Sequence, residues 1–128
     1  MLNLTLRLAD RREKLRVEPQ LYEFARNVGE KFQIPIPRIE ALKYHCIRVK
    51  FDFSGYPRHL LSPKVTSVPI PNGETMRKIV GELELMLKVR DPMFDATKHL
   101  AVFFGRYPDV VFASLENGEW KHPPVERK

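Results

Sequence analysis

The feature that most constrains the fold is an alternation of apolar and polar residues in two separate segments. In the first segment, residues 1–8, the apolar positions are Leu2, Leu4, Leu6 and Leu8. In the second, residues 42–53, they are Ile47, Val49, Phe51 and Phe53. Successive side chains of a β-strand point to opposite faces, so both segments are predicted to be strands with one buried face. A sheet of this kind needs helices to cover that face.

The first covering helix is predicted over residues 18–33. Its apolar residues recur at helical spacing and form one stripe: Leu21, Phe24, Ala25, Val28 and Phe32. Pro19 suits the first helical turn, where a missing N–H costs nothing. The charged segment before it, residues 9–16, is predicted to be a turn or a short exposed helical piece. The prolines of residues 34–38 require an extended path after the helix.

Residues 72–90 fit two kinds of element. Met76, Ile79, Leu83 and Leu87 match a helix, whereas Leu83, Leu85, Leu87 and Val89 match a strand. A helix is favoured because Asn72 can cap its start, and because Lys88 and Arg90 suit its C-terminal end.

The remaining strands are predicted to be short. Pro69 makes residues 64–70 an edge strand. Residues 99–105 and 110–115 read as a hairpin across the turn at 106–109. Asn117-Gly118 is a strong hairpin signal, and Trp120 then begins a last strand. Residues 122–128 are expected to be a frayed tail.

This order of elements predicts an α+β fold. Strand, helix, strand, strand, helix and strand is the βαββαβ pattern of a ferredoxin-like sandwich, here with an additional C-terminal β-hairpin. A length of 128 residues indicates one domain, residues 1–128. Such an architecture hosts many functions, so function must be argued from particular residues.

Several classes of protein are disfavoured. A single cysteine, Cys46, excludes an intramolecular disulfide, and no stretch of about 18 apolar residues is present to span a membrane. The chain shows no signal-peptide pattern, so a cytoplasmic location is predicted. Phosphate-binding glycine loops are missing, and one cysteine with four scattered histidines does not make a standard zinc site. We therefore expect neither a metal nor another cofactor.

Catalysis is the least favoured hypothesis. Cys46 lies in an apolar strand and is interpreted as a small core residue. Tyr56, Arg58 and His59 share one loop, where they suit either metal-independent RNA cleavage or a solvated turn. A ribonuclease that uses His45 or His59 is thus kept as the third hypothesis, and a non-enzymatic role is favoured. His99 is expected at a strand edge, facing solvent.

Charge is the better functional signal. The net charge is +6. Residues 1–64 hold 13 basic and 7 acidic residues, whereas residues 65–128 hold 9 of each. The whole positive excess therefore lies in the first half. Clustered basic residues favour contact with nucleic acid, whose phosphates they neutralise.

The predicted nucleic-acid contacts come from one charged segment, one strand face and one loop. They are Arg11, Arg12, Lys14, Arg16, Arg48, Lys50, Arg58 and Lys64. Tyr44 is expected on the outer face of the 42–53 strand, and Arg7 joins this face if the two alternating strands are neighbours. A sheet face of this kind contacts RNA in RNA-recognition modules, although their RNP1 pattern is missing here.

The leading hypothesis is therefore a small basic binding protein. It would contact nucleic acid, or a transcription or RNA-processing complex, through its N-terminal half. The alternative is a protein-binding regulator or inhibitor of the phage or viral accessory type, acting on host machinery. Its candidate interface is Arg106 and Tyr107 at a hairpin tip, which equally suit an ordinary type I turn. The oligomeric state and the choice between DNA and RNA stay open.

Overall fold

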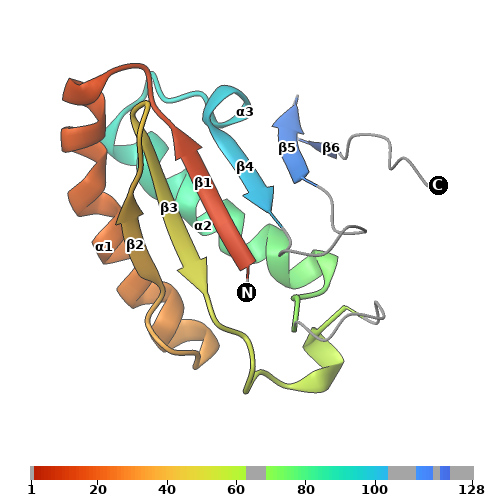
Figure 1. The fold of residues 1–128 in the computed structure, drawn as a ribbon. Helices are drawn as coiled ribbons and strands as arrows, with labels where there is room; N and C mark the ends of the chain where they lie inside the picture. Colours follow the sequence, from red (N-terminus) through yellow and green to blue (C-terminus); the bar gives the residue numbers. More distant parts are fainter. Residues whose placement is uncertain (1, 63–68, 104–111, 117–118, 122–128) are drawn as a thin grey trace.

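The protein has a mixed α+β fold, with an antiparallel sheet and helices packed against it (Figure 1). The computed structural model describes residues 2–62, 69–103, 112–116 and 119–121. The elements are β1 (Leu2–Arg7), α1 (Arg11–Phe32), β2 (Arg38–Ala41), β3 (Cys46–Phe51), the 3-10 helix η1 (Arg58–Leu60), α2 (Gly73–Arg90), α3 (Ala96–His99), β4 (Leu100–Phe103), β5 (Phe112–Glu116) and β6 (Glu119–Lys121).

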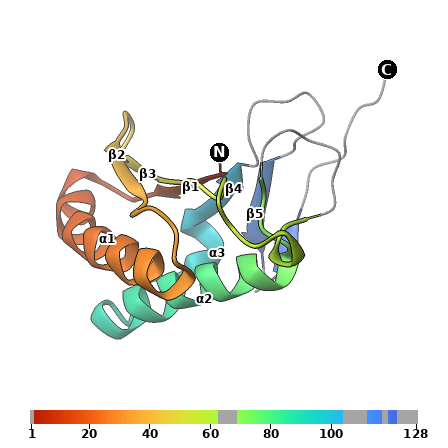
Figure 2. The ribbon, with the colours of Figure 1, turned by 90° about the horizontal axis from the view of Figure 1, so that it is seen from below.

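The strands lie side by side in the order β2-β3-β1-β4-β5-β6, and each neighbouring pair is antiparallel. Leu4 of β1 lies opposite Val49 of β3 on one side and Val102 of β4 on the other. Figure 2 shows α1 and α2 on the same side of this sheet. One face of the sheet is therefore covered by helices; we call the opposite one the open face.

The core lies between the sheet and the two helices. The apolar positions of both alternating strands are buried there, as the period of two predicted. The ring of Phe51 meets Phe24 of α1 edge-on at 6.3 Å and stacks on Phe53 at 5.8 Å. From α2, Met76, Ile79, Val80, Leu83 and Leu87 complete the cluster.

Helix α1 is longer than the sequence predicted. It begins at Arg11, so most of the charged 9–16 segment is its first part rather than a turn. Asp10 caps this start: its carboxylate accepts a hydrogen bond from the backbone N–H of Glu13 at 2.8 Å. Pro19 consequently lies inside the helix, on its exposed side, and not in the first turn.

The predicted 42–53 strand is wrong at its start. Residues 38–41 form β2, the chain reverses at residues 42–45, and β3 begins only at Cys46. Because the turn holds neither glycine nor asparagine, its residues gave no signal of a reversal. Tyr44 therefore lies in a turn rather than on a strand face. Cys46 is half-buried outside the core cluster, contrary to its interpretation as a core residue.

Residues 73–90 are helical, as favoured. The side-chain oxygen of Asn72 accepts a hydrogen bond from the backbone N–H of Thr75 at 2.9 Å, which is the expected cap. Leu85 is 66% exposed and Val89 is 72% exposed. The strand alternative would have buried these two side chains together with Leu83 and Leu87, so the burial pattern follows the helical period.

In the C-terminal part, β4 and β5 pair antiparallel, and β6 contains Trp120. His99 ends α3 and is half-buried, so it does not lie at a solvent-facing strand edge. The predicted turn at 106–109 and the tail at 122–128 lie outside the described residues. So does most of the predicted 64–70 strand, near which Leu61 and Pro71 form an isolated bridge.

Candidate functional site

Three segments far apart in the sequence meet at the end of the sheet where β1 stops and β3 starts (Figure 1). They are the β1–α1 connection with the first turns of α1 (residues 7–16), the β2–β3 turn (residues 42–46) and the stretch from the end of α2 to the end of α3 (residues 91–99). We call this region the Tyr44 end.

Backbone and side-chain hydrogen bonds hold the β2–β3 turn against α1. The backbone N–H of Leu8 donates to the carbonyl of His45 at 3.0 Å. The ammonium group of Lys14 donates to the carbonyl of Leu42 at 2.7 Å. Lys14, one of the predicted nucleic-acid contacts, thus positions the turn.

The third segment is joined to the other two by polar contacts. The guanidinium group of Arg16 donates to the carboxylate of Asp91 at 2.7 Å. His99 Nδ1 lies 2.6 Å from the backbone carbonyl of Arg7. A carbonyl oxygen only accepts, so Nδ1 carries the proton of this contact. The ring of His99 also stacks on Phe94, at 5.4 Å between centroids.

The β2–β3 turn has an unusual backbone. Tyr44 has a φ of 59° and His45 a φ of 61°, so two successive non-glycine residues are left-handed. The backbone N–H of Leu42 donates to the carbonyl of Cys46 at 2.8 Å and closes the hairpin. Turns that need positive φ at both central residues usually hold Asn-Gly, and each ordinary residue there costs about 1–2 kcal/mol. The Tyr44 side chain is 82% exposed.

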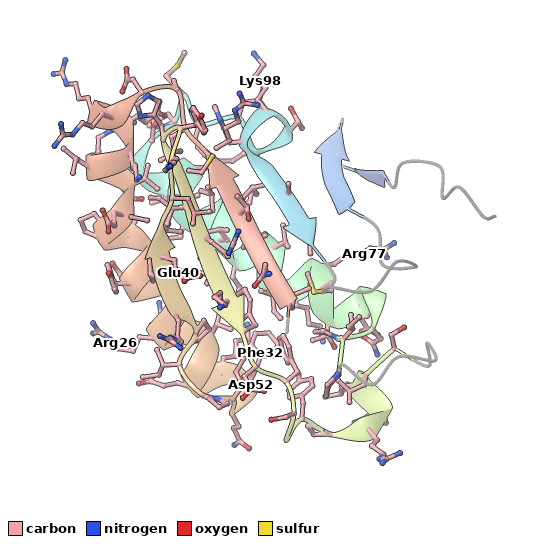
Figure 3. All side chains as sticks on the ribbon, in the orientation of Figure 1. Arg26, Phe32, Glu40, Asp52, Arg77 and Lys98 are labelled. Atoms are coloured by element: carbon pink, nitrogen blue, oxygen red, sulfur yellow. The ribbon has the colours of Figure 1, made fainter. Side chains whose placement is uncertain are left out.

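Positive charge exceeds negative charge at the Tyr44 end. Its acidic residues are Asp10, Glu13, Asp91 and Asp95. Its basic residues are Arg7, Arg11, Arg12, Lys14, Arg16, Lys43 and Lys98. Figure 3 shows Lys98 at this end of the molecule and Asp52 toward the other.

Most of the acidic groups are already engaged. Arg16 pairs with Asp91 and also lies 3.5 Å from Glu13, and Lys98 lies 3.9 Å from Asp95. In the part of the chain that the structure describes, five basic residues of this end make no ion pair. Lys14 instead binds the Leu42 carbonyl, and the other four are Arg7, Arg11, Arg12 and Lys43. All four are exposed.

The engaged carboxyl groups stay ionised at neutral pH. The hydrogen bond from Arg16 holds the pKa of Asp91 below its ordinary value. A hydrogen bond from the Thr97 hydroxyl likewise lowers the pKa of Asp95. Asp91 and Asp95 therefore keep their negative charge beside Arg16 and Lys98, respectively.

A polar cleft of about 650 Å³ opens between the start of α1 and the 91–99 segment. It is lined by Asp10, Arg12, Glu13, Arg16, Asp91, Met93 and His99. Because both acidic and basic groups line it, the cleft offers no uniform field for a small anion. Of its two lining guanidinium groups, that of Arg12 has no carboxylate partner among the described residues.

The open face of the sheet carries the second group of predicted contacts. Arg48 and Lys50 lie on it, and Glu40 of β2 is 3.7 Å from each of them. Thr5 lies opposite Arg48, and Arg7 follows on the same face, as expected for neighbouring strands. Glu40 therefore partly neutralises the positive charge of this face.

The last predicted contacts lie elsewhere. Arg58 is exposed on η1. This helix lies toward the opposite end of the molecule from the β2–β3 turn (Figure 1). Lys64, Arg106 and Tyr107 lie outside the described residues. The structure thus divides the described members of the predicted basic set among three places. Arg11, Arg12, Lys14 and Arg16 lie at the Tyr44 end, Arg48 and Lys50 on the open face, and Arg58 on η1.

The three residues of the loop proposed for RNA cleavage differ in burial. Tyr56 is 8% exposed and packs edge-on against Phe53 at 5.3 Å, and burial raises the pKa of its hydroxyl. Arg58 and His59 are exposed. His45 lies in the β2–β3 turn and His59 belongs to η1. These two segments lie toward opposite ends of the molecule (Figure 1).

Other kinds of site find little support in the described ranges. No group of three or more His, Cys, Asp or Glu side chains there is arranged to hold a metal ion. Likewise, none of the described helices has both the length and the apolar character that crossing a bilayer requires.

Sequence reasoning missed Lys43 and His99 as members of the site. Lys43 belongs to the β2–β3 turn, so predicting this turn would have placed it at the site. The turn gave no signal, because neither Tyr44 nor His45 is typical of a tight turn. Nothing in the sequence joins His99 to Arg7, 92 residues earlier.

Comparison with protein-family models, curated proteins and solved structures gave no significant match for this chain. The class of the protein therefore rests on its own geometry. It is a mixed α+β protein with a polar open sheet face and an end rich in unpaired basic side chains.

Proposed function

We propose that this protein binds nucleic acid through the Tyr44 end. The observation that carries the proposal is a group of exposed basic residues at the same end of the molecule as the exposed ring of Tyr44. They are Arg7, Arg11, Arg12 and Lys43, and none has a carboxylate partner among the described residues. Cations neutralise phosphates, and an aromatic ring beside them can stack on a base. The partner is nucleic acid itself or a nucleic-acid-handling complex.

Each side chain has a distinct role in this proposal. Arg11, Arg12 and Lys43 contact phosphates, which positions the nucleic acid without reading its sequence. Lys14 and Arg16 support the site, because Leu42 and Asp91 already engage them. Arg48 and Lys50 on the open face would extend the contact along the backbone.

We further propose that the chain is a single ferredoxin-like domain with an added C-terminal hairpin. The strand order β2-β3-β1-β4, with α1 after β1 and α2 after β3, supports this finer description. A single core cluster that draws on both helices and the sheet supports one domain. In such a domain, the Tyr44 end and the open face would form continuous surface.

The test is the salt dependence of binding to mixed-sequence DNA and RNA. For duplex DNA, log K should fall with log salt by about 0.9 for each neutralised phosphate. The double variant Arg11→Ala/Arg12→Ala should make that slope shallower by about 2. No binding at low salt, or a flat salt dependence, would refute the proposal.

A matched control removes the same charge elsewhere. Arg26 on α1 and Arg77 on α2 are exposed and lie away from the Tyr44 end (Figure 3). The double variant Arg26→Ala/Arg77→Ala should keep the wild-type slope. Equal losses in both double variants would show that net charge, and not the Tyr44 end, drives binding.

A protein-binding role is the second candidate, and a different surface favours it. A groove of about 410 Å³ lies between α1 and α2, with the exposed Leu85 and Val89 along it. The ion pairs Lys31–Glu82 and Arg90–Glu23 flank the groove. Exposed apolar side chains with a charged rim are common at protein interfaces.

Capture from a nuclease-treated lysate separates the two candidates. Under the protein-binding role, a partner should stay bound after nucleic acid is removed, and Val89→Glu should release it. Lys78→Glu on an exposed part of α2 is the matched control. A partner that Val89→Glu retains as fully as wild type would exclude the groove.

A further inference from the structure

The side chain of Tyr44 does not contribute to the hydrophobic core. It is 82% exposed and is not part of the core cluster. Its backbone is left-handed, and so is that of His45, which makes the turn less stable than an Asn-Gly turn would be. A strained, exposed aromatic residue is a reason to look for a ligand, because strain of this kind concentrates at functional sites.

Three hydrogen bonds hold the turn that carries this ring. The Leu42 N–H to Cys46 carbonyl bond closes it, the Lys14 ammonium binds the Leu42 carbonyl, and the Leu8 N–H binds the His45 carbonyl. The ring is thus presented from a fixed backbone, so little conformational entropy is lost when a ligand stacks on it.

The surroundings of the ring indicate the ligand class. Lys43 and His45 flank Tyr44 directly, and the unpaired Arg11 and Arg12 lie on the adjoining start of α1. Aromatic rings beside cations suit a strand whose bases are unstacked, since every base has a face available for stacking. In a duplex the base faces are hidden, and a projecting ring finds only phosphates and groove edges.

We propose that Tyr44 stacks on an unpaired base, so that the Tyr44 end prefers single-stranded nucleic acid to duplex. This inference rests on the proposed function, because it specifies the form of nucleic acid bound at the same site. Lys43 and the α1 arginines neutralise the phosphates on either side of the stacked base. The interaction is sequence-tolerant, because stacking does not depend on a base-edge pattern.

The experiment compares a mixed-sequence single strand with the duplex of the same sequence, at one low salt concentration. Wild-type protein should bind the single strand more tightly. Tyr44→Ala should weaken single-strand binding by about 5- to 100-fold and leave duplex binding unchanged. Tyr44→Phe keeps a ring and should bind like wild type.

A second variant guards against a folding defect. Asparagine tolerates the left-handed backbone, so Tyr44→Asn should keep or raise the melting temperature while it weakens single-strand binding as Tyr44→Ala does. Its binding loss therefore cannot come from unfolding.

The outcomes separate the two claims. If wild type binds both forms equally, or if Tyr44→Ala and Tyr44→Asn bind the single strand as wild type does, the stacking inference is overturned and the proposed function stands. If wild type binds neither form, both are overturned.

Discussion

The two faces of β1 and β3 belong to the same strands but carry opposite kinds of residue. On the covered face, Leu4 of β1 and Ile47 of β3 are buried against the helices. On the open face, Arg48 and Lys50 share one acidic neighbour, Glu40, at 3.7 Å. One face supplies the apolar core, and the other holds charges that water can reach.

The two faces contribute differently to the stability of the fold. Burial of apolar surface stabilises a fold by about 25 cal/mol per Å². Exposed ion pairs contribute about 0–1 kcal/mol. Substitutions on the open face and at the Tyr44 end therefore cost less stability than substitutions on the covered face.

The largest effect is expected on the covered face. Phe51→Ala removes a fully buried ring that contacts Phe24 and Phe53, and should lower the free energy of unfolding by about 3–5 kcal/mol. Urea denaturation measures it. Lys50→Ala, one residue earlier on the open face, should stay within about 0.5 kcal/mol. Similar losses in both variants would break the contrast between the two faces.

Substitutions in the β2–β3 turn should raise the free energy of unfolding instead of lowering it. Tyr44→Asn/His45→Gly puts residues that accept positive φ at both strained positions, and should raise the free energy of unfolding by about 1–2 kcal/mol. Thermal unfolding measures this gain. The control Tyr44→Ala/His45→Ala removes the same side chains but keeps the strain. An equal gain in the control would mean that the backbone conformation is not responsible.

The cap of a covering helix is expected to matter less than the core. Asn72→Ala removes the side-chain oxygen that accepts from the Thr75 N–H, and should lower the free energy of unfolding by about 1 kcal/mol. Asn72→Asp keeps an acceptor at this position and should lose much less. Urea denaturation midpoints of the two variants measure this difference in stability. Identical midpoints would contradict the role of the cap.

The smallest effect is expected from the ion pair at the Tyr44 end, and it depends on pH. Arg16 lowers the pKa of Asp91 in the folded state. The pair therefore adds stability above the unfolded pKa, near 4, and that stability is lost as the pH falls through the folded pKa. Arg16→Ala should melt below wild type at pH 7, and this difference should shrink as the pH falls below about 4. A gap that is constant with pH would show that Arg16 stabilises only through packing.

The covered faces of the strands and helices were predictable, because each depends on local periodicity. Leu2, Leu4 and Leu6 are buried on one side of β1, and Leu83 and Leu87 on one side of α2. The start of α1 was not predictable, because the buried residues of this helix begin only at Val17. The charged residues 11–16 before it carry no apolar helical period. The β2–β3 turn was missed for a different reason, since Tyr44 and His45 are not typical turn residues.

The candidate site was predictable only in part. The basic segment at Arg11 to Arg16 was expected from charge alone, and it lies at the Tyr44 end. Lys43, Tyr44 and His99 join it through strand pairing and hydrogen bonds that no local pattern encodes. Arg58 was grouped with them by its charge, yet η1 lies toward the opposite end of the molecule (Figure 1).

The sequence alone determined which side chains face the core, since strands and helices impose periods of two and 3.6 residues on neighbouring positions. It also determined that the positive excess lies in the first half of the chain. The tertiary structure decided which basic residues share a surface and which keep a carboxylate partner. Those choices depend on the pairing of β3 with both β1 and β2, and such pairing joins residues across distances in sequence that local periodicity does not reach.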